Sequence, residues 1–224
     1  MIQSVVSPAL RQRVRGWAVP VARALGGLGL TPNHLTMIGF AGTCAAAILA
    51  AGQIWLAAGV LVIGFGIFDL LDGALARATG RTSRFGAFLD STLDRMGENL
   101  VYAGVAIGSA ARDYVPGVVV AVLALAFASG VTYARAKAEV VGLHGEVGFA
   151  PREVRLALLG TTLILVGYLG GIGQQIDGNP WGDRILTGSL GLIAALSAIT
   201  VLQRIVHARR QALDLEAGSG DRRP

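Results

Sequence analysis

The fold is decided by a long segment without Asp, Glu, Lys or Arg, residues 24–68, which read ALGGLGLTPNHLTMIGFAGTCAAAILAAGQIWLAAGVLVIGFGIF. Three further segments also lack these charged residues, and they lie between Asp113 and Arg135, between Arg155 and Asp177, and between Arg184 and Arg204. Each can hold about 20 apolar residues, which is one bilayer crossing. Because 53% of the chain is hydrophobic and only 15% is charged, too few polar side chains remain to coat a soluble domain. We therefore expect an integral membrane protein.

Working outward from these segments, we expect an all-α fold of six transmembrane helices, at residues 33–52, 54–77, 85–111, 115–141, 152–171 and 185–209. Thr31 followed by Pro32 predicts an N-cap and a first helical position. Residues 5–28 carry apolar side chains at steps of three and four between arginines, which predicts an interfacial amphipathic helix before the first span. Residues 1–212 then form a single membrane domain, followed by a disordered tail over residues 213–224.

The distribution of Lys and Arg predicts the orientation. Most of these residues fall on one side of the expected membrane, and only Arg112 and Arg184 fall on the other. By the positive-inside rule both termini are cytoplasmic, in a multi-pass protein of the cell membrane. The basic residues flank apolar spans instead of forming a patch on a soluble scaffold, which argues against nucleic-acid binding. With Cys44 as its one cysteine, the chain can form neither a disulfide framework nor a Cys-based zinc site.

An acidic segment covers the end of the second expected span and the beginning of the third: residues 69–94 read DLLDGALARATGRTSRFGAFLDSTLD. On a helix, Asp69 and Asp72 are about 300° apart, and Asp90 and Asp94 about 400°, so each pair shares one face. Carboxylates that converge in a poorly hydrated place repel one another, and hard divalent cations neutralise them. The sequence therefore predicts two Mg²⁺ or Mn²⁺ ions that act on a pyrophosphate, in a site that faces the cytoplasm.

Two other interpretations of the acidic segment are open. The carboxylates could merely pair with nearby arginines at the bilayer surface. They could also form the ion pathway of a small ion-coupled transporter, because carboxylates within spans are typical of such pathways. A pathway predicts acids spread through the depth of the membrane, whereas these acids cluster at one end of two helices. Clustering favours the metal site.

The acidic segment resembles the signature of the CDP-alcohol phosphotransferase family, with the spacing Asp69-x-x-Asp72-Gly73-x-x-Ala76-Arg77, then eight residues, then Gly86-x-x-x-Asp90-x-x-x-Asp94. The segment Leu30-Thr31-Pro32-Asn33-His34-Leu35-Thr36 also resembles the one before that family's first span. The resemblance implies transfer from a CDP-linked lipid to an alcohol with release of CMP, by a homodimer. It implies metal binding by Asp69, Asp72 and Asp90. It also implies that Asp94 approaches a metal ion and acts as the base that takes the proton from the acceptor hydroxyl. It implies a CDP-lipid site made by Thr31, Pro32, Asn33, Thr36, Gly73, Arg77 and Gly86.

A second cluster, of cations, bears on the acceptor. Arg135 and Lys137 alternate with alanines at the end of the fourth span, and the further members are Arg152, Arg155 and Arg204. Several cations suit an acceptor that carries a phosphate. The segment Gly148-Phe149-x-x-Arg152-x-x-Arg155 and the late Arg204 resemble the inositol-phosphate site of prokaryotic phosphatidylinositol-phosphate synthases, although Arg135 and Lys137 stand in exchanged order. The resemblance implies CDP-diacylglycerol as donor and inositol phosphate as acceptor, with glycerol 3-phosphate as the alternative acceptor and an archaeal ether lipid as the alternative donor.

Overall fold

The structure of the chain is a computed structural model, which describes residues 29–66, 68–80, 82–145 and 147–220 and a few positions between 20 and 27. Within these ranges the side chains of Asp69, Leu70, Asp72, Ala78, Thr79 and residues 217–220 are not described. Most of the expected interfacial helix over residues 5–28, including all of residues 5–19, and the last four residues of the chain fall outside the described part.

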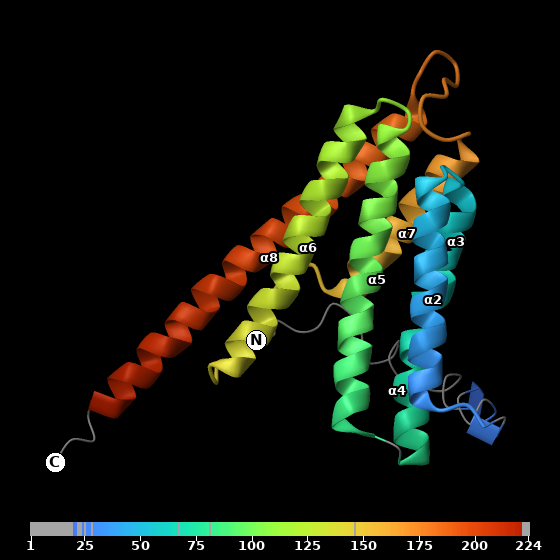
Figure 1. Cartoon of the computed structure of the whole chain (residues 1–224). Helices are drawn as coiled ribbons and strands as arrows, with labels where there is room; N and C mark the ends of the chain where they lie inside the picture. The colour runs from blue at the N-terminus through green and yellow to red at the C-terminus, as the bar shows by residue number, and fades with distance from the viewer. Residues whose placement is uncertain are drawn as a thin grey trace.

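The described chain is an all-α bundle, as expected, and its helices follow one another up and down the molecule (Figure 1). They are α2 (Pro32–Ala51), α3 (Trp55–Gly66), α4 (Phe68–Thr79), α5 (Arg84–Ala110), α6 (Val115–Val140), α7 (Arg152–Tyr168) and α8 (Trp181–Gly220). Three of them are long and apolar enough to cross a membrane, namely α2, α6 and α8, and α3 is a shorter apolar helix.

Helix α2 begins where the sequence predicts. Thr31 is its N-cap and Pro32 its first residue. The Thr31 hydroxyl accepts a hydrogen bond from the backbone N–H of His34 at 3.3 Å, and the backbone N–H of Thr31 donates to the His34 ring at 3.4 Å. This reciprocal arrangement is a capping box in which His34 takes the place usually held by Glu or Gln.

The second expected span corresponds to α3, which ends at Gly66, and α4, which begins at Phe68, and Ile67 between them lies outside the described residues. One expected helix differs from the structure in length. The sixth helix does not end near residue 209, because α8 continues to Gly220. The expected disordered tail is thus helical over residues 213–220, where Leu and Ala are strong helix formers.

Small residues bring the helices close together. A Cβ atom at Gly104 of α5 would collide with the carbonyl oxygen of Ala47 of α2, and one at Gly59 of α3 would lie 2.6 Å from the carbonyl oxygen of Gly160 of α7. Lipid tails are as apolar as Leu, so packing at this range holds membrane helices together where the hydrophobic effect does not. The main core contains the buried side chains of Trp55, Tyr102, Leu159, Leu163, Leu186 and Leu190.

A second, smaller core positions α4. Leu71, Ala74 and Leu75 of α4 are buried against Leu35 of α2, with Phe68 packed beside them. This contact fixes the acidic helix α4 against the start of α2. Helix α5 begins at the same end of the molecule, below α2 and beside α4 in Figure 1. The three helix segments that carry the family signature therefore meet at one end of the bundle.

Candidate active site

A cavity of about 190 Å³ lies between α2, α4 and α5. It is lined by Pro32, Asn33, Thr36, Gly73, Ala76, Arg77, Thr82, Ser83, Gly86, Ala87 and Asp90. Six of the seven residues expected to bind the CDP-lipid are in this lining, and the seventh, Thr31, caps α2 one residue before it. Residues from two signature segments, far apart in the sequence, are thus brought to one cavity.

Two glycines keep this cavity open. A Cβ atom at Gly86 would lie 3.0 Å from the Ser83 hydroxyl oxygen and 3.1 Å from the Asn33 side-chain oxygen. A Cβ atom at Gly73 would lie 3.3 Å from a guanidinium nitrogen of Arg77. Larger residues would push polar side chains out of their places in the lining, so the glycines are needed for space and not for an unusual backbone conformation.

The start of α5 is fixed by a cap that also lines the cavity. Ser83 is the N-cap of α5, and its hydroxyl accepts a hydrogen bond from the Gly86 N–H at 2.9 Å. Ser83 was not among the residues predicted from the sequence, although a Ser before a helix is a known start signal. The cap holds the first turn of α5, and with it Gly86, against the cavity.

The four expected metal ligands lie on the two helices that face each other across the cavity. Asp90 lines the cavity, and Asp94 follows one turn later on α5. Asp69 and Asp72 lie on α4, where Asp72 directly precedes the lining residue Gly73. Carboxylate oxygens are the donors that Mg²⁺ and Mn²⁺ prefer. Among the described side chains, no group of three or more His, Cys, Asp or Glu is close enough to hold a metal ion, and the side chains of Asp69 and Asp72 are not described. The metal site therefore stays a prediction, supported by the donor chemistry of the four carboxylates.

Asp94 is held by a cation from another helix. Its Oδ2 atom lies 2.5 Å from Nη1 of Arg152, the first residue of α7. The side chains are partly exposed, at 20% for Asp94 and 26% for Arg152. One of the cations expected for the acceptor is therefore in direct contact with the expected base.

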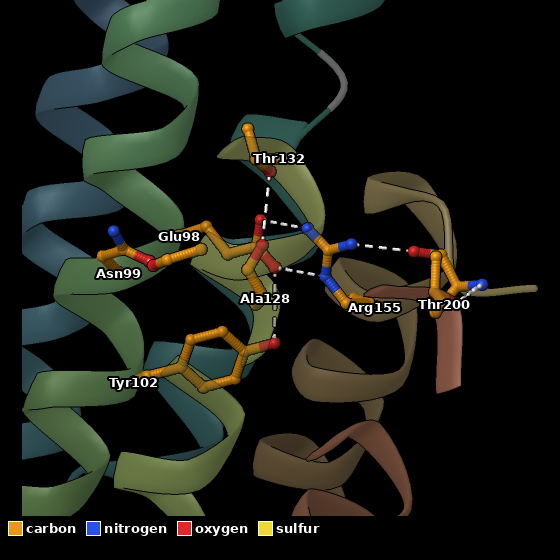
Figure 2. A network of polar contacts seen from close by, with 9 residues as sticks. Glu98, Asn99, Tyr102, Ala128, Thr132, Arg155 and Thr200 are labelled. Atoms are coloured by element: carbon orange, nitrogen blue, oxygen red, sulfur yellow. Dashed lines mark hydrogen bonds and ion pairs between the residues drawn. The ribbon is translucent and has the colours of Figure 1, made fainter. Parts of the chain in front are cut away.

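Arg155, three residues later, has a different environment, which Figure 2 shows. Its Nε and Nη2 atoms donate to the two oxygens of Glu98 at 2.7 and 2.8 Å, and its Nη1 atom donates to the Ala150 carbonyl at 2.7 Å. Both side chains are almost fully buried, at 2% and 4% exposure. The role of Arg155 as a phosphate ligand stays a prediction, because these donors are directed at protein groups.

The other expected acceptor cations come from α6 and α8. Arg204 donates from Nε to the Val147 carbonyl at 2.9 Å and from Nη1 to the Val131 carbonyl. Arg135 pairs with Glu139 at 2.9 Å on an exposed face of α6, and Lys137 is exposed. The structure thus brings Arg152 to the acidic cluster and uses Arg204 to join α6, α8 and the loop before α7.

Two charged residues on α5, Arg95 and Glu98, were not among the predicted site residues. Arg95 interacts electrostatically with Asp94, Arg135 and Arg152, and it lines a second cavity of about 220 Å³ together with Glu98, Asn99, Ala128, Ser129, Thr132, Tyr133 and Ala136. Glu98 was visible in the sequence because it continues the row of Asp90 and Asp94 at steps of four. Its partner was not, since Arg155 lies 57 residues further along the chain.

The chain is similar over most of its length to proteins of known function and structure. A phosphatidylinositol phosphate synthase of Cutibacterium acnes is 38% identical over 87% of this chain and 95% of its own length. The crystal structure of the Mycobacterium tuberculosis phosphatidylinositol phosphate synthase with CDP-DAG bound is 32% identical and covers 86% of this chain and 93% of its own, with a TM-score of 0.75. The same enzyme in complex with manganese and citrate is 33% identical, covers 85% of this chain and 88% of its own, and has a TM-score of 0.74.

The family model described as CDP-alcohol phosphatidyltransferase matches residues 29–201. This match contains both signature segments and all the cavity residues, and it ends three residues before Arg204. The chain belongs to the CDP-alcohol phosphatidyltransferase family and is a phosphotransferase.

Proposed function

We propose that this enzyme transfers the phosphatidyl group of CDP-diacylglycerol to inositol phosphate and releases CMP. The observation that carries the proposal is the cavity of α2, α4 and α5, whose lining contains the expected CDP-lipid residues and Asp90, with the Asp94–Arg152 pair one turn away. In the reaction, an acceptor hydroxyl oxygen forms a bond to the phosphorus that carries the diacylglycerol. The anhydride bond from that phosphorus to the CMP phosphate breaks, CMP leaves with the bridging oxygen, and the hydroxyl proton passes to Asp94.

The donor's polar head fits the cavity by its chemistry. Arg77 can offer a planar pair of N–H groups to phosphate oxygens, and Asn33 and Thr36 supply donors and acceptors for a nucleotide. Gly73 and Gly86 leave the room in which the pyrophosphate would approach the helices. The Mycobacterium tuberculosis enzyme of the same fold has been solved with CDP-DAG bound, which supports CDP-diacylglycerol as the donor.

Two divalent ions, Mg²⁺ or Mn²⁺, are proposed to be held by Asp69, Asp72, Asp90 and Asp94. When bound, they would polarise the pyrophosphate and stabilise the leaving CMP. The manganese complex of the Mycobacterium tuberculosis enzyme supports the use of such a metal. Asp94 would in addition accept the proton, and its contact with Arg152 fixes where its carboxylate stands. A carboxylate is a weak base, so its contribution rests on being within hydrogen-bond reach of the hydroxyl.

The acceptor's phosphate is proposed to bind among the cations Arg135, Lys137, Arg152, Arg155 and Arg204. Arg152 is nearest to the reacting groups, because it contacts Asp94. Arg95 adds charge to the same region, since it interacts with Asp94, Arg135 and Arg152. A dianionic acceptor suits this surplus of cations better than a neutral alcohol does. The similarity to phosphatidylinositol phosphate synthases over nearly the whole chain supports inositol phosphate in particular.

In the membrane, α2 is proposed as the first span, α3 and α4 together as the second, and α5 to α8 as the third to sixth. The cation-rich end that contains the cavity would face the cytoplasm. The family resemblance further supports a homodimer.

The deciding experiment is an acceptor panel with the purified protein in detergent. CMP release would be measured with CDP-diacylglycerol, Mg²⁺ or Mn²⁺, and one of inositol phosphate, glycerol 3-phosphate, free inositol or serine. We expect release with inositol phosphate that depends on the metal, and little with free inositol, which lacks the phosphate. Preference for glycerol 3-phosphate would change the acceptor but keep the reaction, whereas no release with any acceptor would contradict the proposed function.

A further inference from the structure

We propose that Glu98 is a positioning residue for the reaction above: its buried ion pair with Arg155 holds the neighbouring Arg152 against Asp94. The inference rests on the proposed function, in which Asp94 is the base and Arg152 contacts the acceptor. Glu98 is not part of the family signature described above. Neither does it line the cavity of α2, α4 and α5. Its effect would pass through Arg155 and the first turn of α7.

The two ion pairs form a ladder between α5 and α7, which we call the ion-pair ladder: Asp94 with Arg152, and Glu98 with Arg155. Asp94 and Glu98 are four residues apart on α5, and Arg152 and Arg155 are three residues apart on α7. Residues at these steps lie on the same side of a helix, about one turn apart. An ion pair at one of these steps limits how α7 can rotate about its axis and slide along α5. It therefore also limits where the residues of the other pair can lie.

The two pairs differ in how firmly they can be held. Asp94 and Arg152 are exposed to 20% and 26%, whereas the Glu98 and Arg155 side chains are exposed to only 4% and 2%. A pair that water can reach contributes little by itself. A buried pair cannot open without leaving a desolvated charge, which costs far more. The buried pair is thus the one that can hold the other in place.

The buried pair is also tied to its surroundings on three sides (Figure 2). On α5, the Tyr102 hydroxyl donates to Glu98 at 3.4 Å. Before α7, Arg155 donates to the Ala150 carbonyl at 2.7 Å. On α8, the Thr200 hydroxyl accepts from the Ala150 N–H at 3.3 Å. Glu98 and Arg155 therefore connect α5, α7, α8 and the loop that leads into α7.

The start of α7 depends on this connection. Its N-cap is Pro151, which makes no side-chain capping bond. A helix start without a cap frays unless something else holds it. Here the hydrogen bonds of Arg155 and Ala150 hold the start of the helix. Arg152 is the first residue after the N-cap, so its position depends on them. Loss of the Glu98 carboxylate would free the first turn of α7 and move Arg152 away from Asp94.

The test is the Glu98→Gln variant, which keeps the shape of the side chain and removes its charge. For a positioning role, kcat falls and the KM for inositol phosphate rises, so that kcat/KM for the acceptor drops about tenfold or more while the KM for CDP-diacylglycerol stays within about twofold. If Glu98 had a different role, as a group that keeps Arg155 from the acceptor, the acceptor KM would change in the opposite direction. Loss of Glu98 would then release a phosphate-binding Arg155 and lower the acceptor KM, which would overturn the inference.

Two further variants separate position from folding. The double variant Glu98→Leu with Arg155→Met removes both buried charges, a change that buried pairs often tolerate, and it should fold yet show the same acceptor defect. Because it also removes Arg155, a proposed acceptor cation, this defect supports the ladder only together with faster hydrogen–deuterium exchange at the start of α7. Wild-type kcat and acceptor KM in a folded double variant would overturn the inference. Tyr114→Phe is the matched control for lost stability. Tyr114 is the N-cap of α6, at the end of that helix away from the ion-pair ladder, and its hydroxyl makes hydrogen bonds to Asp183 and Thr187 of α8 that the variant loses. The variant should leave the acceptor KM unchanged.

A readout that needs no turnover keeps the two proposals distinguishable. Hydrogen–deuterium exchange of residues 147–156 should speed up in Glu98→Gln and stay at the wild-type rate in Tyr114→Phe. A wild-type protein that is inactive with every acceptor would overturn the proposed function, and the ion-pair ladder would then be judged by exchange. Unchanged exchange in Glu98→Gln would overturn the ladder, whatever the activity.

Discussion

Asp90 and Asp94 show how much a single helical turn decides at the scale of the residue. Both are carboxylates on one side of α5. Asp90 lines the cavity, whereas Asp94 meets Arg152 from α7. Asp94 therefore stands at the boundary between the expected donor site and the expected acceptor cations. This position suits a group that takes a proton from the acceptor while the donor's phosphate is attacked.

The residue-scale prediction concerns Asp94→Asn. Asn keeps the size and one oxygen but cannot accept the proton as a carboxylate does, so we expect kcat to fall by about 10²–10⁴-fold, with binding of CDP-diacylglycerol retained. The rate of CMP release measures kcat, and a direct lipid-binding assay measures the binding of CDP-diacylglycerol. Asp113→Asn, at an exposed position in the turn between α5 and α6, is the control and should leave kcat unchanged. Substantial turnover in Asp94→Asn would remove Asp94 from the role of base.

At the scale of the helices, local signals in the sequence predicted what local interactions determine. The Thr31-Pro32 start of α2 is confirmed, because a cap depends on residues within one turn. The shared face of Asp90 and Asp94 follows from helical periodicity alone. The partner of Glu98 was not predictable, since its contact with Arg155 depends on how α5 packs near α7. The length of α8 was also missed, because hydropathy does not mark helix ends.

The helix-scale prediction concerns the contact of α2 with α5. Gly104 of α5 faces the Ala47 carbonyl so closely that even a Cβ atom collides with it. Gly104→Leu must therefore push the two helices apart, and we expect a loss of about 3 kcal/mol or more, read as a lower melting temperature in detergent. Gly188→Leu on α8 is the matched control, because a Cβ atom there meets nothing within 4 Å. Equal melting temperatures for the two variants would contradict this account of α2–α5 packing.

At the scale of the whole molecule, charge and chemistry are gathered at one end. The cavity lies at the end of the bundle at which α2 and α5 begin, and the C-terminal part of α8, which contains Arg204, Arg209 and Arg210, runs towards the same end (Figure 1). At 40 residues, α8 is about 60 Å long, twice the roughly 30 Å of a bilayer core. We propose that its C-terminal part, which contains Arg204, Arg209 and Arg210, extends beyond the membrane on the side of the site. By the positive-inside rule we expect that side to be cytoplasmic.

The orientation can be tested with two single-cysteine variants. In a Cys44→Ala background, Gln175→Cys places a thiol in the exposed loop between α7 and α8, and Leu213→Cys places one on the exposed end of α8. A membrane-impermeant thiol reagent should label the first variant in intact cells and the second only after the membrane is permeabilised. The reverse pattern would put the cavity on the outer side and contradict the proposed orientation. Labelling of both variants in intact cells would mean that α8 does not cross the membrane between residues 175 and 213, and the six-span arrangement would have to be abandoned.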